Sequence, residues 1–231
     1  KIIKPDVGVI TNISYAHIKN FENINEIALA KSEIIKNIKD DGYLILNKDD
    51  KFYNFHQKIG LKRNLKILSF SLNNKSATTN LDSISKEKSK YKISININKK
   101  KLYFYLNTFF ENDLKNFLAT ISIISIFTDI HKLDKNIFYD HKPVNGRGDI
   151  MKVKLFKKNF YLIDESYNSN PLSLKSALKN FDMIKVNNSK KHLVLGDMLE
   201  LGKYSKKLHI AIGKSINKTS LKNVNVIGEY I

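Results

Sequence analysis

The sequence of 231 residues contains no cysteine, which excludes disulfides, thiolate metal sites and cysteine nucleophiles. It has only three prolines and nine glycines, so no stretch has the composition of a long linker. The longest apolar stretch, residues 117–127, is shorter than the run of about eighteen apolar residues that a membrane span requires. The first residues also lack the shape of a signal peptide. We therefore expect no membrane span, and the absence of cysteine fits a reducing compartment such as the cytoplasm.

Arginine is scarce as well, although the formal net charge is +18. It occurs only at Arg63 and Arg147, and the remaining positive charge is lysine spread along the chain. Nucleic-acid sites depend on arginine for forked contacts with guanine and phosphate. We therefore expect no nucleic-acid partner, and a basic nucleic-acid-binding module stays open as an alternative.

What the chain does contain is an alternation of apolar runs and helical patterns. In order, the pattern predicts a strand, a helix, a strand, a helix and a strand over residues 6–13, 24–38, 43–46, 51–59 and 65–72. This alternation is typical of a parallel sheet covered by helices. In the helix at 24–38 we expect one buried stripe, formed by Ile27, Ala30, Ile34 and Ile38.

The middle of the chain has a different pattern. Residues 73–90 are polar and indicate a loop, whereas residues 91–106 alternate in polarity and predict an antiparallel hairpin. Residues 112–127 predict a buried helix. Pro143 and two glycines then mark a break at 143–149, after which strands and helices resume. We place a domain boundary between residues 144 and 145.

Polar side chains gather just after the predicted strands. They lie in four segments, residues 11–17, 46–50, 164–171 and 195–202. Ligands of parallel α/β sheets bind outside the carboxyl ends of the strands, so these segments are the candidate site. Each one alone is more simply explained as turn chemistry or a helix cap.

Six motifs, in this order and spacing, resemble the Mur ligase family. They are "PDVGVITNISYAHIKNF", "IALAKSEI", "GYLILNKDD", "NGRGD", "IDESYNSNPLSLKSAL" and "LVLGDMLELGKYSKKLHIAIG". The last two resemble the branch of the family that adds D-alanyl-D-alanine. The resemblance spans almost the whole chain, and the hairpin region is the least informative part.

The resemblance implies an α/β fold of two parts. Residues 1–144 would be the later, parallel-sheet part of a P-loop-type ATP-binding domain that carries an antiparallel hairpin. Residues 145–231 would be an incomplete Rossmann-like C-terminal domain. The family's N-terminal domain and phosphate loop would precede Lys1, so we expect an internal fragment that is inactive alone and a monomer when complete.

The implied activity is amide ligation that depends on ATP and Mg²⁺. A terminal carboxylate of UDP-N-acetylmuramoyl-tripeptide would be phosphorylated, and the amine of D-Ala-D-Ala would attack the acyl phosphate during peptidoglycan precursor synthesis. The alternatives are a sister ligase that adds a single amino acid, a nucleic-acid-binding module, and a non-catalytic partner derived from a ligase.

The resemblance also assigns roles to individual residues. His17 and Lys31 match the catalytic metal-binding histidine and a lysine that the family carbamylates, which would turn a cationic side chain into an anionic oxygen ligand. The residues implied to bind the nucleotide are Asn112, Asn116, Arg147, Asp164, Glu165 and Asn168. Asn112 and Asn116 match the adenine-side motif only in part, because Phe109 and Glu111 replace its Gly and His. The residues implied to bind substrate are Tyr167, Asn170, Asp197, Glu200 and His209.

Overall fold

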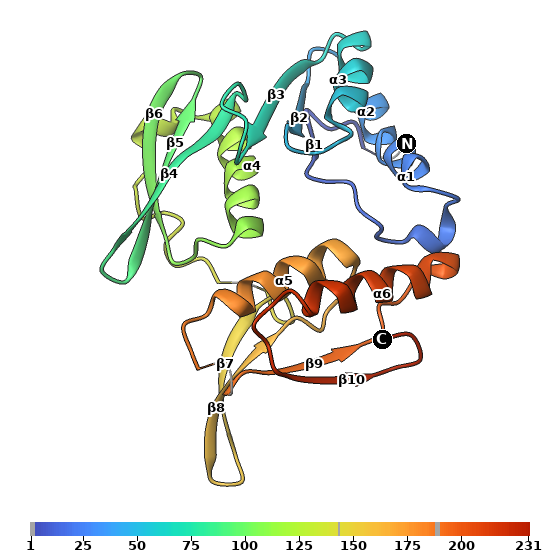
Figure 1. Cartoon of the computed structure of the whole chain (residues 1–231). Helices are drawn as coiled ribbons and strands as arrows, with labels where there is room; N and C mark the ends of the chain where they lie inside the picture. Colours follow the sequence, from blue (N-terminus) through green and yellow to red (C-terminus); the bar gives the residue numbers. More distant parts are fainter. Residues whose placement is uncertain (1–2, 143, 188–189) are drawn as a thin grey trace. The chain divides into compact units, whose positions relative to one another are not determined.

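The computed structural model describes residues 3–142, 144–187 and 190–231 (Figure 1). The chain forms two compact units. Unit 1 comprises the residues up to Ile13 together with Asn25–His141, and unit 2 comprises Ser14–Ile24 together with Lys142–Ile231. Pro143, part of the predicted break, lies outside the described residues. The predicted boundary between residues 144 and 145 concerns domain identity and stays a prediction.

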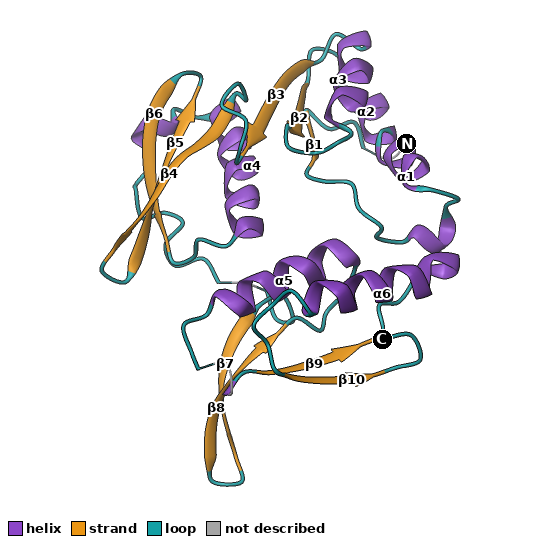
Figure 2. Cartoon of the chain, viewed as in Figure 1, coloured by secondary structure: helices purple, strands orange, loops and turns teal. Residues whose placement is uncertain are grey.

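Unit 1 is built on a six-stranded sheet with strand order β1-β2-β3-β4-β5-β6 (Figure 2). The strands are β1 (Val7–Ile10), β2 (Tyr43–Asn47), β3 (Lys66–Ser71), β4 (Thr79–Glu87), β5 (Lys90–Ile97) and β6 (Lys100–Leu106). The first three pair in parallel, β4 joins β3 in parallel over a short stretch, and β5 and β6 continue antiparallel. The predicted parallel sheet with a hairpin is therefore confirmed.

Helices cover this sheet. Helix α3 (Tyr53–Lys62) packs on β2 and β3, and α4 (Glu111–Phe127) packs on β2, β3 and β4. The alternating residues Ile93, Ile95 and Ile97 of β5 are buried in the core against α4, as their spacing predicts. These contacts fix the ends of the parallel strands, which is where the candidate site was expected.

The predicted loop at 73–90 was wrong, because β4 occupies residues 79–87. The outer half of β4 is exposed and polar, so its pairing with β5 depends on backbone hydrogen bonds rather than on an apolar face. The β5–β6 turn was predicted correctly. Its residues Asn98 and Lys99 have φ of 48° and 67°, the left-handed pair that a tight hairpin turn needs.

The single helix predicted at 24–38 is interrupted at Ser32. Helix α1 (Ile24–Lys31) ends there and α2 (Glu33–Asn37) begins, because the Ser32 hydroxyl donates to the Leu29 carbonyl at 2.6 Å. The buried positions shift as a result. Ile35 is fully buried and Ile34 is 38% exposed, which corrects the predicted stripe.

Unit 2 combines a hairpin with a parallel strand pair. Its elements are β7 (Asp149–Leu155), β8 (Lys158–Asp164), α5 (Pro171–Met183), β9 (His192–Gly196), α6 (Ser205–Ile216) and β10 (Asn223–Ile227). Helices α5 and α6 pack against each other, and β9 pairs with β10 in parallel. Strand β7, the partner of the predicted strand β8, was not predicted. No helix among the described residues of either unit could cross a membrane.

Candidate functional site

The acidic pair at the end of β2 ties neighbouring strand ends together. Asp50 accepts the backbone N–H of Ile13 at 2.8 Å, just after β1. Asp49 accepts the Ser71 hydroxyl at 2.6 Å and the Leu72 backbone N–H at 2.7 Å, at the end of β3. The segment 46–50 therefore has a structural role, which fits the simpler explanation offered by its sequence.

The other candidate residues of unit 1 are exposed. Lys31 is the last residue of α1, and no contact among the described residues holds its ammonium. Asn112 and Asn116 lie one turn apart on the same side of α4, in its first two turns. All three side chains are exposed to solvent.

Residues 14–24, here called the strap, leave unit 1 after β1 and pack on unit 2. His17 Nδ1 is hydrogen-bonded to the carboxylate of Glu200, and the Lys19 backbone N–H donates to the Glu200 carbonyl at 2.9 Å. The Tyr204 hydroxyl donates to the Glu22 carbonyl. Two residues predicted to have different functions, His17 and Glu200, are thus direct partners.

A second cluster surrounds Arg147 in unit 2. The Arg147 guanidinium lies 4.6 Å from the centre of the Tyr167 ring, which is a cation–π contact. Gly148, with a φ of 88°, donates its N–H to the Asp164 carbonyl at 2.7 Å, and this turn brings Glu165 close. The hydroxyl and backbone N–H of Ser166 both donate to Asp164 and lower the pKa of its carboxyl. The cluster therefore presents one cation beside a carboxylate held in its charged form.

The side chain of Asn170 caps the start of α5. Its side-chain oxygen accepts the backbone N–H groups of Leu172 and Ser173 at 3.0 and 3.1 Å. Its own N–H donates to the Ser173 hydroxyl at 3.0 Å, which completes a capping box, and Pro171 fills the first helical position. Asn168, two residues earlier, is exposed.

Asp197 and His209 are also engaged by their own unit. Asp197 accepts the backbone N–H groups of Glu229, Tyr230 and Ile231 at 2.8, 3.1 and 3.1 Å, and these bonds lower the pKa of its carboxyl. His209 is 2% exposed, accepts the Met198 N–H on Nε2 at 2.9 Å and uses Nδ1 on the Ser205 carbonyl at 2.8 Å. Both nitrogens of His209 are therefore satisfied inside unit 2.

The sequence did not single out Asp49, Asp50 or Tyr204 as individual site residues. Tyr204 contacts a residue 182 positions away, and no local pattern encodes such a pairing. Asp49 and Asp50 belong to the polar segment 46–50, but the sequence of that segment does not identify their partners on other strands. Among the described residues, no group of three or more acidic or histidine side chains lies close enough to hold a metal ion.

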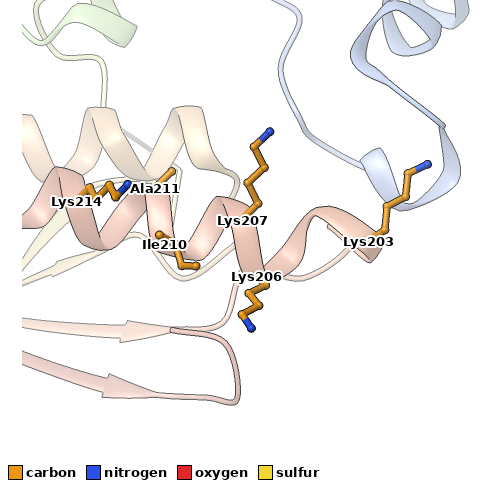
Figure 3. Close-up of a pocket in the computed structure, with 6 residues that line it drawn as sticks. All are labelled: Lys203, Lys206, Lys207, Ile210, Ala211 and Lys214. Carbon is orange, nitrogen blue, oxygen red and sulfur yellow. The ribbon is translucent and has the colours of Figure 1, made fainter.

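One further surface feature is a lysine-rich face on α6 (Figure 3). An open depression of about 500 Å³ is lined by Ile210, Ala211 and the four lysines Lys203, Lys206, Lys207 and Lys214. No acidic side chain is paired with these four lysines among the described residues. This face is shallow and has the charge pattern of a solvated helix surface.

The fold is that of an α/β protein, and it places polar side chains just after the carboxyl ends of parallel strands, the region where ligands of such sheets bind. Residues 1–124 match the family model described as the Mur ligase middle domain. The chain belongs to the Mur ligase family.

Similar proteins agree with this assignment. The UDP-N-acetylmuramoyl-tripeptide–D-alanyl-D-alanine ligase of Rickettsia prowazekii is 29% identical over 243 residues, which cover 100% of this chain and 50% of that protein. The structure of MurF from Acinetobacter baumannii superposes with a TM-score of 0.85 at 22% identity, over 99% of this chain and 48% of that one. MurF from Thermotoga maritima in complex with ADP gives a TM-score of 0.81 at 23% identity, over 98% and 49%. The chain spans about half the length of the curated relatives it matches.

Proposed function

We propose that this chain is part of an ATP-dependent amide ligase that adds D-Ala-D-Ala to UDP-N-acetylmuramoyl-tripeptide. The observation that carries the proposal is the continuous likeness, over the whole chain, to ligases named for that reaction. The segments 166–171 and 195–202, which by resemblance favour this branch over its sister ligases, are both present in the sequence.

The nucleotide is proposed to meet the Arg147 cluster. An arginine held over the Tyr167 ring is restrained for contact with phosphate oxygens, since its planar fork matches two of them. Asp164 is held ionised by Ser166, and a carboxylate in that state accepts hydrogen bonds from the two ribose hydroxyls. Glu165 would share that task, and Asn168, Asn112 and Asn116 would supply amide contacts to the rest of the nucleotide.

Mg²⁺ is proposed to be held by His17 and a carbamylated Lys31. The donor chemistry fits in part, because His17 keeps Nε2 available while Nδ1 is bound to Glu200. An ammonium cannot ligate Mg²⁺, whereas the carbamate of the exposed Lys31 would offer the oxygen that this ion prefers. Bound Mg²⁺ would neutralise charge that develops on the transferring phosphoryl group.

Fewer residues are free to contact the substrate than the sequence resemblance implies. Tyr167 is 67% exposed and so is available to a ligand, whereas the exposed Glu200 carboxylate is hydrogen-bonded to His17. Asn170, Asp197 and His209 have their hydrogen-bonding groups engaged within unit 2. We propose that these three shape the substrate side by holding the loops, and that contact with D-Ala-D-Ala comes from their neighbours.

The test uses the complete protein that contains this chain. Purified protein is given ATP, Mg²⁺ and UDP-N-acetylmuramoyl-tripeptide, with D-Ala-D-Ala or with single amino acids as the amine. We expect phosphate release and a product of the mass of the pentapeptide only with D-Ala-D-Ala. Equal turnover with a single amino acid and the matching shorter precursor would instead identify a sister ligase.

The nucleic-acid alternative needs its own measurement. Filter binding of DNA and RNA at about 150 mM salt separates weak, charge-driven contact from a specific site. We expect weak binding that added ATP does not change. Tight binding without ligase turnover would overturn the proposed function.

A further inference from the structure

The turn that contains Glu200 holds the strap by its backbone and by its side chain. The Glu200 carbonyl accepts the Lys19 N–H at 2.9 Å, while the Glu200 carboxylate binds His17 Nδ1. Gly202, with a φ of 51°, packs so closely on the strap that a Cβ there would lie 3.2 Å from the Lys19 Cα. The backbone therefore holds the strap at points separate from the side-chain pair.

Both members of the His17–Glu200 pair have a left-handed backbone. The φ of His17 is 59° and that of Glu200 is 61°, a region that residues other than glycine rarely adopt. Such conformations persist where the surroundings hold them, and they gather at binding sites. Here the two strained residues face each other from segments that are 183 positions apart in the chain.

The side-chain pair itself adds little to stability. The His17 and Glu200 side chains are 52% and 55% exposed, so their contact is screened by solvent and contributes little to stability. What the pair does fix is the orientation of the imidazole. Because Nδ1 is hydrogen-bonded to the Glu200 carboxylate, Nε2 on the opposite side of the ring faces away from Glu200.

We propose that Glu200 is a positioning residue for His17: it holds the imidazole in the tautomer whose Nε2 lone pair is free to bind a divalent cation. The inference rests on the proposed function, since the cation is the Mg²⁺ of the nucleotide site. It gives Glu200 a role in positioning His17 rather than in binding the incoming amine. A carboxylate behind a metal-binding histidine also raises the basicity of the ligand nitrogen.

The experiment compares the complete wild-type protein with Glu200→Gln, which keeps the size of the side chain and the backbone bond to Lys19. Glutamine can offer its NH₂ group to Nδ1 and so permits the opposite tautomer. The matched control is Glu229→Gln, which removes one exposed acid from the same unit. His17→Gln assigns the histidine signals.

Two readouts are taken from ¹⁵N NMR of the histidine side chains. In metal-free protein we expect wild type and Glu229→Gln to have the proton on Nδ1 of His17, and Glu200→Gln to have a mixture of tautomers. Mg²⁺ is then titrated in the presence of ADP. We expect Glu200→Gln to need about 10- to 100-fold more Mg²⁺ to shift the His17 Nε2 signal.

The outcomes separate this inference from the proposed function. An unchanged His17 tautomer in Glu200→Gln overturns the inference, as does a changed tautomer with unchanged Mg²⁺ dependence. A His17 Nε2 signal in the wild type that does not respond to Mg²⁺ overturns it too. Ligase turnover is measured separately, so a complete protein without turnover would overturn the proposed function while the NMR result still decides the role of Glu200.

Discussion

Lys31 differs from the other lysines of the chain in its position at a helix break. It ends α1, directly before Ser32, and its ammonium has no partner among the described residues. The carbonyl end of a helix favours a cation, so an anionic carbamate at Lys31 needs a nearby metal ion to offset that field. Carbamylation and Mg²⁺ binding should therefore depend on each other.

This dependence gives a prediction for the complete protein that contains this chain. Lys31→Ala should lower ligation by about 10³-fold or more, because a metal ion contributes several kcal/mol to the reaction and each 1.4 kcal/mol is a factor of ten. A short-chain carboxylic acid should restore part of the rate by supplying the missing oxygen ligand. Lys36→Ala, at an exposed position on α2, is the matched control. Normal turnover of Lys31→Ala would show that Lys31 is an ordinary surface lysine without a role in the reaction.

Asp197 gives a pH dependence with a defined sign. The backbone N–H groups of Glu229, Tyr230 and Ile231 lower the pKa of its carboxyl in the folded protein. The stabilisation is therefore present above the unfolded pKa of about 3.9 and is lost as the pH falls through the folded pKa. Thermal unfolding of wild type should weaken more between about pH 5 and pH 3 than that of Asp197→Asn. Parallel pH profiles of the two proteins would contradict the prediction.

The position of Asn170 at the start of α5 explains its role through the helix that it caps. The sequence resemblance implies a substrate role for Asn170, but its side-chain oxygen caps the helix. Asn170→Ala should lower the free energy of unfolding by about 1 kcal/mol, while Asn170→Ser should keep most of it because serine also caps well. Denaturant unfolding measures both changes.

The KM for D-Ala-D-Ala separates the two roles of Asn170. A helix cap predicts that Asn170→Ser leaves this KM close to the wild-type value. A substrate contact predicts a raised KM in Asn170→Ser and in Asn170→Ala alike, without a matching difference in stability between them.

Elements with their own apolar signature could be predicted from the sequence, and elements defined by their partners could not. Residues 112–127 have a helical apolar face and form α4. Strand β4 has a polar outer half, and β7 has its partner in β8, so neither has a distinct pattern of its own. The interruption at Ser32 depends on one hydroxyl hydrogen bond, which periodicity does not encode.

In the candidate site too, some features could be predicted from the sequence and others could not. Family motifs pointed to the segments that contain His17, Arg147 and Asp164, and these segments do carry exposed polar groups. The pairing of His17 with Glu200 and of Arg147 with Tyr167 required the folded chain. A motif identifies residue types in order, whereas the partner of each side chain depends on contacts between distant segments.

At the scale of the whole molecule, the two units differ in how much core they contain. A large cluster of buried apolar residues lies in unit 1, and most of the fully buried apolar side chains among the described residues belong to that unit, whereas Ile18 and Ile212 are examples from unit 2. Unit 2 also exposes large apolar side chains, with Tyr161 on β8 at 72%, Ile227 on β10 at 72% and Phe156 in the β7–β8 turn at 88%. Regions with few buried apolar contacts open at lower free energy than the core.

The last prediction follows from this difference. In hydrogen–deuterium exchange of the protein, amides of β7–β10 should exchange faster than those of β1, β2 and β3, because opening unit 2 exposes less buried apolar surface. The comparison uses strand amides of both units, so that each set is hydrogen-bonded in the folded state. Equal protection of both sets would mean that the two units unfold as one cooperative body. Slower exchange in unit 2 would mean that its exposed apolar strands are covered by a partner in solution.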